Sequence, residues 1–264
     1  MSAAFLYRDV MVSAAFIGDL GTVASPSLPL GNLTDSQPRI RTRWTPASAS
    51  IYVDFGASQT VSALALIGTN LTAASTVRWR IGNDAGFSAT NYDTGDLYAL
   101  TTAAAGGNVV LLHATSASGR YMRVDLADLV LGWIDVGRLV AGPLFRTTHA
   151  WAYGAGEGRL MLDRRDRNGF TGAEFPVPAV VNPRVMHFTL GAITQAEAVG
   201  DFRTMQDTLG AAGDALWIPD DGLSLAELNQ RSIWGAVAQP GESALITRSN
   251  FRLHSRSFQM VERV

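Results

Sequence analysis

The amino-acid sequence predicts a mainly β protein, with an N-terminal β-sandwich followed by a smaller α+β part that has one main helix. Residues 1 to about 145 contain many short segments rich in β-branched and aromatic residues, separated by clusters of Gly, Asn, Asp, Ser and Thr. Such spacing is typical of a sandwich or jelly roll. Beyond Pro183, one segment with helical spacing is followed by further strand-like segments.

The segments of the first part alternate as strands do. In TVRWRIG, residues 76–82, apolar side chains alternate with two arginines, which predicts a strand with one solvent-facing side. VSALALIGTN, residues 61–70, is apolar on both sides and predicts a central strand covered on both faces. The expected strands are Ile51–Phe55, Val61–Ile67, Thr76–Ile81, Val109–His113, Tyr121–Leu126 and Trp133–Ala141.

A change in composition near residue 145 indicates a domain boundary. We therefore expect a sandwich at 1–145 and an α+β domain at 146–264. The segment 150–182 is rich in glycine, charge and proline and has few residues that could join a core. It is interpreted as an extended arm of the second domain.

The helix of the second part has recognisable ends. Thr194 and Glu197 have the spacing of a capping box, in which both side chains bind free backbone amides of the first helical turn. Gly210 is placed to end the helix. The apolar residues at helical spacing between these ends are Val199, Phe202, Met205 and Leu209. Further strands are expected in ALWIP (215–219), SIWGAV (232–237) and FRLHSRSFQMV (251–261).

Composition argues against several classes of function. The chain has 264 residues, of which 47% are apolar and 17% charged, enough to form a sizeable core. Its net charge of −2 provides no field that would attract nucleic acid. No cysteine is present, so disulfides and thiolate metal sites are excluded. Because no stretch has the ~18 uncharged apolar residues of a membrane span, we expect no membrane insertion.

No arrangement of residues suggests catalysis, a metal site or a cofactor. The four histidines are far apart, and none has a second ligand at a metal-binding spacing. Asp220 and Asp221 are adjacent in a Pro/Gly turn, whereas a hydrolase needs two carboxylates set across a cleft. The glycine-rich GAGEG at 154–158 precedes a strand-like segment, whereas a phosphate loop precedes a helix. We expect a protein that is not an enzyme.

Several segments of the first part occur in the order and spacing of a known family. They are GNLTD (31–35), Trp44 after RIRTR, IYVDFG (51–56), VSALALIGTNL (61–71), TVRWRIG (76–82) and GRYMRVDL (119–126). On these segments the first part resembles the discoidin-type, galactose-binding-like jelly roll. The resemblance implies that IYVDFG and VSALALIGTNL are two core strands of one sandwich.

Segments from both parts together resemble a narrower class of protein. They are AAFLYRDV (3–10), GWIDVGRLVAGPLF (132–145), LWIPD (216–220), RSIWGAV (231–237) and SFQMVERV (257–264). With the sandwich, they resemble minor structural proteins of tail tips in tailed phages and gene-transfer particles, and the C-terminal part is similar to the ring-forming domain of distal-tail proteins. This implies a virion component, made in the host cytoplasm, that contacts copies of itself and other tail-tip or baseplate proteins.

The resemblance to the discoidin-type family also implies candidate binding residues. In that family, glycans bind at loops on one end of the sandwich, where aromatic rings stack on the sugar and polar groups bind its hydroxyls. Arg41, Arg43, Trp44 and Asn70 are the corresponding candidates. Trp44 also fits the sandwich core, which general burial tendencies favour, and Arg43 also fits an ion pair with an acid such as Asp35.

Two functions are therefore open. The first is a virion structural component that forms a homo-oligomer around the tail axis and displays a carbohydrate-binding-like domain. The alternative is a carbohydrate-binding module or receptor-binding adhesin, with a host surface glycan as its partner. Nearly half of the chain, including Trp217 and Trp234, lies outside the sandwich. A simple lectin would not need this second part, so the sequence favours the first function.

Overall fold

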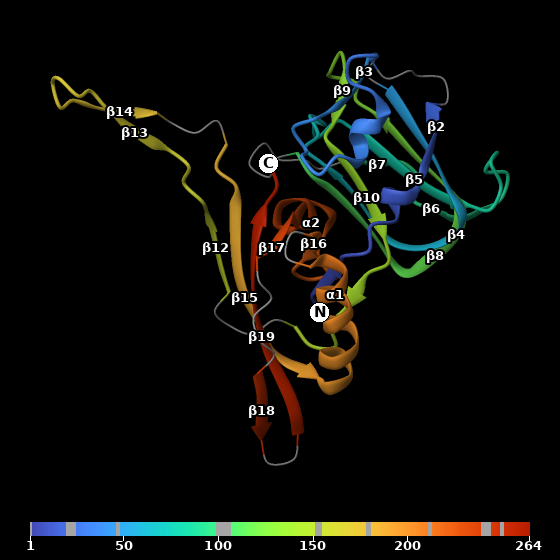
Figure 1. Ribbon diagram of the computed structural model, residues 1–264. Helices are drawn as coiled ribbons and strands as arrows, with labels where there is room; N and C mark the ends of the chain where they lie inside the picture. Colours follow the sequence, from blue (N-terminus) through green and yellow to red (C-terminus); the bar gives the residue numbers. More distant parts are fainter. Residues whose placement is uncertain are drawn as a thin grey trace.

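The computed structural model describes residues 2–19, 25–45, 48–98, 107–150, 155–177, 181–210, 213–238, 244–248 and 251–264. It is mainly β, with a β-sandwich in the first part and a second large sheet with one main helix in the other (Figure 1). The predicted fold class is therefore confirmed. No helix in the described ranges is both long enough and apolar enough to span a bilayer.

The larger sheet of the sandwich has seven antiparallel strands. Its order is β10-β4-β8-β5-β6, with β2 beside β4 and β7 beside β5. The strands are β2 (Ala15–Asp19), β4 (Ser48–Ile67), β5 (Thr76–Gly82), β6 (Thr90–Asp93), β7 (Leu97–Tyr98), β8 (Val109–Ala127) and β10 (Arg138–Gly142).

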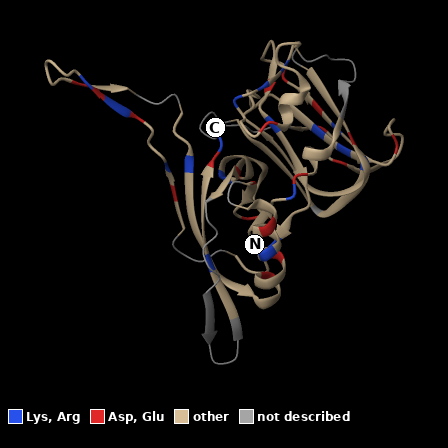
Figure 2. Ribbon diagram, in the orientation of Figure 1, with Lys and Arg blue, Asp and Glu red and all other residues tan. Residues whose placement is uncertain are grey.

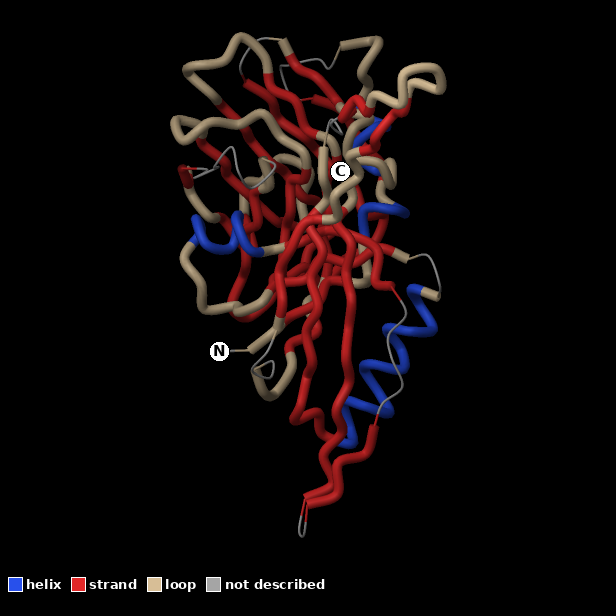
Figure 3. The backbone as a smooth tube through the Cα atoms, turned by 90° about the vertical axis from the view of Figure 1, so that its left-hand side faces the viewer, coloured by secondary structure: helices blue, strands red, loops and turns tan. Residues whose placement is uncertain are grey.

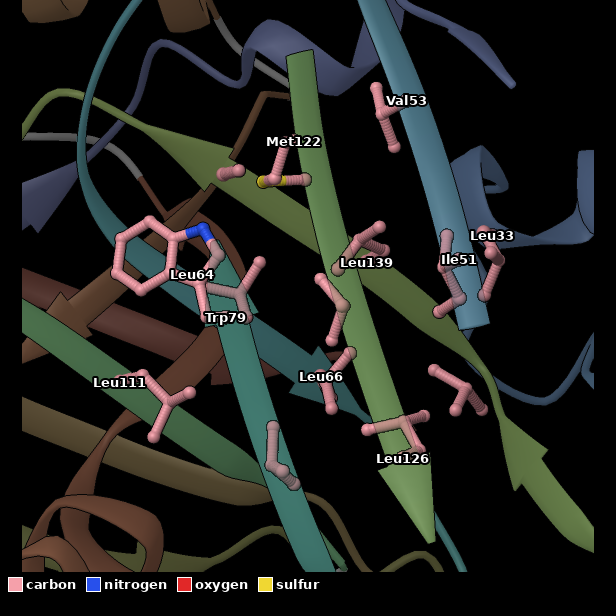
Figure 4. Close-up of a cluster of buried hydrophobic side chains, with 14 of the residues drawn as sticks. Leu33, Ile51, Val53, Leu64, Leu66, Trp79, Leu111, Met122, Leu126 and Leu139 are labelled. Atoms are coloured by element: carbon pink, nitrogen blue, oxygen red, sulfur yellow. The ribbon is translucent and has the colours of Figure 1, made fainter. Parts of the chain in front are cut away.

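The second layer of the sandwich is smaller. Strand β3 (Thr42–Trp44) pairs with β9 (Ile134–Val136), and the 3-10 turns η1 (Val10–Ser13) and η2 (Leu30–Thr34) extend this layer. The side chains between the layers are buried; Figure 4 shows Trp79, Leu64 and Leu33 among them. This is the main core of the first part.

The strand pattern differs from the sequence prediction in two places. The segments 51–55 and 61–67 belong to one long strand, β4, whose pairing with β8 shifts in register between Asp54 and Gln59 and again between Val61 and Ala63. Conversely, 133–141 is divided between β9 and β10, which lie in different sheets. The division falls at Gly137, where a Cβ atom would lie 2.0 Å from the carbonyl oxygen of Pro38. Only glycine allows the two backbones to approach so closely.

The second sheet contains strands from both ends of the chain. Its order is β11-β1-β16-β17-β19-β15-β12, with β18 beside β19. The expected boundary at residue 145 falls at the start of β11, while the N-terminal β1 completes this second sheet between β11 and β16. The strands are β1 (Ala4–Leu6), β11 (Phe145–Arg146), β12 (Gly156–Arg159), β15 (Arg184–Thr194), β16 (Asp214–Ile218), β17 (Ile233–Ala238), β18 (Ala244–Arg248) and β19 (Phe251–Glu262).

The predicted helix begins and ends where its end residues indicated. Thr194 Oγ1 donates to Glu197 Oε2 at 2.7 Å, and the Glu197 amide donates back to Thr194 Oγ1 at 3.3 Å. A π-helical turn, η4 (Glu197–Asp201), follows and leads into α1 (Phe202–Leu209), and Gly210 ends it with a φ of +57°. Figure 3 shows this helix along one side of the second sheet.

A second, shorter helix, α2 (Leu225–Arg231), was not predicted. Ser224 caps it, and Glu227 completes a capping box whose spacing is visible in the sequence. The helix has only seven residues, which is too short for a recognisable helical repeat of apolar residues in the sequence.

The two parts of the protein share a buried interface. Ala63, Ala65 and Ile67, on the face of β4 opposite to Leu64, pack in one cluster with apolar side chains of the second part. Those side chains include Ala4, Leu6, Leu216, Ile218, Leu228 and Trp234. The prediction that 61–70 is covered on both faces is therefore confirmed, and its second face is covered by the C-terminal part.

Candidate functional site

Three of the four candidate residues meet at Asp135, on β9. Arg43 donates from Nε and Nη2 to the two carboxylate oxygens of Asp135, each at 2.7 Å. Asn70 Oδ1 accepts from the Asp135 amide at 2.7 Å, and Arg41 Nη1 lies 3.7 Å from Asp135 Oδ2. The contacts join β3 and the segment just before it, the loop after β4, and β9. Arg43 thus pairs with Asp135 and not with Asp35.

The fourth candidate, Trp44, lies apart from this group. Its side chain is fully buried in the sandwich core, so its ring is not accessible to a sugar. The core position, which burial tendencies favour, is the one that the structure shows.

An accessible aromatic residue beside this group is Trp133. It is 43% exposed, its carbonyl accepts from Asn70 Nδ2 at 3.1 Å, and the Arg43 guanidinium lies 5.4 Å from its ring centroid. The sequence pattern predicts a strand at 133–141 and does not mark Trp133 as a site residue. The alternation of that segment places Trp133 with Asp135 and opposite to Ile134, and this could have identified it.

The loop that leads to Trp133 is held by Asp128. Its Oδ1 accepts from the amides of Val130 and Leu131 at 2.8 and 3.1 Å, while its Oδ2 accepts from Thr72 Oγ1 at 2.9 Å and Ser75 Oγ at 2.5 Å. Burial opposes the charged form of Asp128, but these hydrogen bonds outweigh burial and lower its pKa to about 2. The hydrogen bonds of Asp128 therefore hold the loop before Trp133 in a defined conformation.

We expect Asp128→Asn to destabilise the fold by about 2 kcal/mol at pH 7, because the folded-state pKa lies well below the ordinary value of 3.8. A lowered pKa stabilises the folded state above pH 4, and this contribution is lost as pH falls through 2. The difference between variant and wild type should thus shrink toward pH 2, as measured by urea unfolding at both pH values. A difference that stays constant with pH would show that the pKa of Asp128 is the same in the folded and unfolded states.

The sandwich loops present apolar side chains beside this group. Leu129 and Val130, four and three residues before Trp133, are 93% and 69% exposed. An aromatic ring, two arginines and an amide could contact a sugar ring and its hydroxyls, and the two aliphatic side chains could pack against an apolar surface. Within the ranges the structure describes, no group of three or more His, Asp or Glu could hold a metal ion.

The adjacent aspartates 220 and 221 are part of the second sheet's framework. Asp221 Oδ2 accepts from Arg146 Nε at 3.1 Å, and its Oδ1 accepts from the Ser2 amide at 3.4 Å. Asp220 Oδ1 accepts from the Gly222 amide at 2.9 Å, as in a solvent-facing turn. These contacts stabilise the turn after β16 and the N-terminal segment.

Comparison with known proteins gives similarity at the level of solved structures. No protein-family model matches the sequence, and no curated protein matches it. The module CBM32-1 from a family 31 glycoside hydrolase of Clostridium perfringens is 13% identical, with a TM-score of 0.41; the match covers 52% of this chain and 99% of the module. Chitosan-binding module 1 from a chitosanase/glucanase of Paenibacillus sp. IK-5 is 18% identical, with a TM-score of 0.39 and coverages of 52% and 99%. A fucose-binding module of Streptococcus pneumoniae, SpX-3, is 8% identical, with a TM-score of 0.39 and coverages of 52% and 98%.

Proposed function

We propose that the protein is a structural component of a phage or gene-transfer-particle tail tip or baseplate, where it assembles with copies of itself around the tail axis and displays its sandwich. The tail-tip setting comes from the sequence resemblance. The observation that supports an assembly role is the arm at 156–177, whose part beyond β12 extends away from both sheets (Figure 1).

The arm has almost no core of its own. Beyond its root strand β12, the strands β13 (Arg164–Arg167) and β14 (Glu174–Val177) pair only with each other. Every residue of the three strands is exposed except Val177, which is half-buried. An isolated two-stranded ribbon is marginally stable in water, so contact with a neighbour would stabilise this one.

The arm also exposes apolar side chains that a monomer would not need. Leu160, Met161 and Leu162 form a continuous exposed run near its root, and Phe170 and Phe175 are exposed near its tip. Opposite charges are interleaved between them (Figure 2), with Arg165 3.6 Å from Glu174. Apolar groups rimmed by polar groups are typical of a protein–protein interface.

We expect charged substitutions at exposed apolar residues of the arm to abolish self-association. The variant Met161→Asp with Phe170→Asp places two charges in the proposed interface, and burying them unpaired should weaken association at least 100-fold. Light scattering and sedimentation at micromolar concentration should show oligomers for the wild type and monomers for the variant. Leu129→Asp with Val130→Asp, which places the same number of charges at exposed apolar residues of the sandwich, should leave the oligomer intact.

Two results would contradict the proposal. One is a wild-type chain that is monomeric at 100 µM or that shows the same mass as the arm variant. The other is electron microscopy of the source particle that locates this chain away from the tail tip. The first would reject arm-mediated assembly, and the second would reject the tail-tip setting.

The group at Trp133 favours a second candidate function, glycan binding. In a glycan array, Trp133→Ala should reduce any saturable signal at least tenfold, because it removes the exposed ring on which a sugar would stack. Phe170→Ala removes an exposed aromatic ring of the arm and should leave the signal unchanged. Absence of saturable binding by the wild type, or equal effects of both variants, would reject this function for the Trp133 group.

A further inference from the structure

A pocket of about 200 Å³ lies where the sandwich, the second sheet and the root of the arm meet. Arg39 and Arg41 from the sandwich, Arg159 from the arm root, and Arg184 and Arg263 from the second sheet all contribute to its lining. Five arginines from three parts of the fold thus surround one small volume. The fold brings them together, since they are spread from residue 39 to residue 263 in the sequence.

The acidic side chain in the pocket lining does not neutralise this charge. Glu262 is bound to Arg184, with its Oε1 accepting from Nε at 2.9 Å and from Nη2 at 2.6 Å, and its Oε2 accepting from the Arg184 amide at 3.0 Å. Arg263 donates to Asp214 at 2.9 Å, outside the lining. Arg39 is exposed and makes no ion pair with the residues that the structure describes. Arg41 lies 3.7 Å from the carboxylate of Asp135, which is also outside the lining. The lining itself therefore carries five arginines and the single carboxylate of Glu262.

The remaining walls are suited to a small organic molecule. Asn108 and Asn182 provide polar amide groups, while Ile67 and Val181 provide apolar surface. Asn182 also fixes the arm root, because its carbonyl accepts from Arg159 Nη1 at 3.2 Å and its Oδ1 accepts from the Leu162 amide at 2.9 Å. A ligand in this pocket would contact the sandwich and the arm root together.

We propose that this pocket binds a small organic carboxylate of roughly monosaccharide size. The planar guanidinium fork donates two parallel hydrogen bonds to a carboxylate, and such charge-assisted pairs are stronger than neutral ones. The amide and apolar walls would contact the rest of the ligand. A bare inorganic ion would leave the space beside these walls unfilled. The pocket shares Arg41 with the group around Asp135 but is distinct from Trp133, which does not line it.

The experiment compares glucuronate with glucose, which has nearly the same shape but no charge. In isothermal titration or NMR titration of the full chain, glucuronate should bind with a dissociation constant of about 1 mM or below, and glucose should not bind. NMR shifts should centre on Gly68, Asn108 and Arg263, which line the pocket. Ligand binding in this pocket does not depend on assembly. The binding proposal is therefore tested separately from self-association through the arm.

Matched variants identify the pocket as the site. Arg39→Glu reverses one lining charge without breaking an ion pair within the described residues, and it should weaken glucuronate binding at least tenfold. Arg203→Glu makes the same change at an exposed arginine of α1 outside the pocket, and Trp133→Ala alters the neighbouring group; both should bind as the wild type does. Equal binding of glucose, no binding at 10 mM glucuronate, or sulfate binding as tight as glucuronate would overturn the proposal.

Discussion

Replacing Phe5 by alanine is expected to lower the free energy of unfolding by about 3–5 kcal/mol, the usual cost of removing a fully buried aromatic side chain. Phe5 is fully buried, although it lies only four residues from the chain start. Its ring is at the centre of an aromatic cluster in the second part. The ring centroids lie 6.2 Å from Phe145, 6.0 Å from Phe188, 6.2 Å from Phe202 and 5.6 Å from Phe258.

The measurement is urea unfolding followed by fluorescence and circular dichroism. Leu129→Ala is the control, because this apolar side chain is exposed on the sandwich, outside the proposed arm interface, and its truncation should change the free energy by less than about 0.5 kcal/mol. The large effect of Phe5→Ala should appear in signals from Trp217, which lies in the same cluster. Similar small effects of both variants would show that β1 does not contribute to the second sheet.

Replacing Arg138 by methionine should cost about 3–5 kcal/mol at pH 7, because it leaves a buried carboxylate without its partner. Arg138 Nη2 donates to Asp9 Oδ2 at 2.9 Å, and both side chains are less than a tenth exposed. The guanidinium also donates to the carbonyl of Asp35 at 2.7 Å and lies 4.7 Å from the ring centroid of Trp234. This pair links the sandwich to the segment that precedes it and to the second sheet.

The pH dependence of this variant has a definite sign. Burial raises the pKa of Asp9, and Arg138 opposes that rise; without the arginine the pKa should rise further. When the folded-state pKa of Asp9 is raised, the group contributes stability below the unfolded value of 3.8. This stability is lost as pH rises through the folded-state pKa. The destabilisation by Arg138→Met should therefore be smaller at pH 4 than at pH 7.

A second substitution tests this cause directly. Asp9→Asn in the Arg138→Met background removes the buried charge but keeps an oxygen that can accept from the Met11 amide, now bound at 3.0 Å. The double variant should recover at least half of the lost stability at pH 7 and should show no pH dependence from this position. If the double variant is no more stable than Arg138→Met, the loss comes from packing against Trp234 and not from the charge of Asp9.

Local patterns predicted the elements of this protein well. Alternation in TVRWRIG predicted β5, and its two solvent-side arginines form ion pairs there, Arg78 with Asp93 at 2.6 Å and Arg80 with Asp125. The Thr194 and Glu197 spacing predicted the start of the main helix. These predictions succeed because each depends on contacts between neighbours in the sequence or on one periodic face.

The candidate site was predicted only in part for the same reason. Arg41, Arg43 and Asn70 were expected on loops, although Arg43 lies on β3. Their common partner, Asp135, lies 92 residues after Arg43, and no local pattern connects them. Trp44 lies between Arg43 and Thr45, and Trp133 lies between Gly132 and Ile134, so the immediate neighbours do not show which ring is buried. Which of the two tryptophans is buried depends on the layer that packs against each, and that is decided only when β3 and β9 pair.

By itself, the sequence determined the mainly β class, several of the sandwich strands and the capped helix, because residue periodicity and end residues are local properties. The tertiary structure alone decided that β1 completes the second sheet, that the outer face of β4 is buried against the C-terminal part, and that five arginines line one pocket. Each of these depends on contacts between residues far apart in the chain. Such contacts form only where the packing of whole layers brings the residues together, so they leave no pattern in any short stretch of sequence.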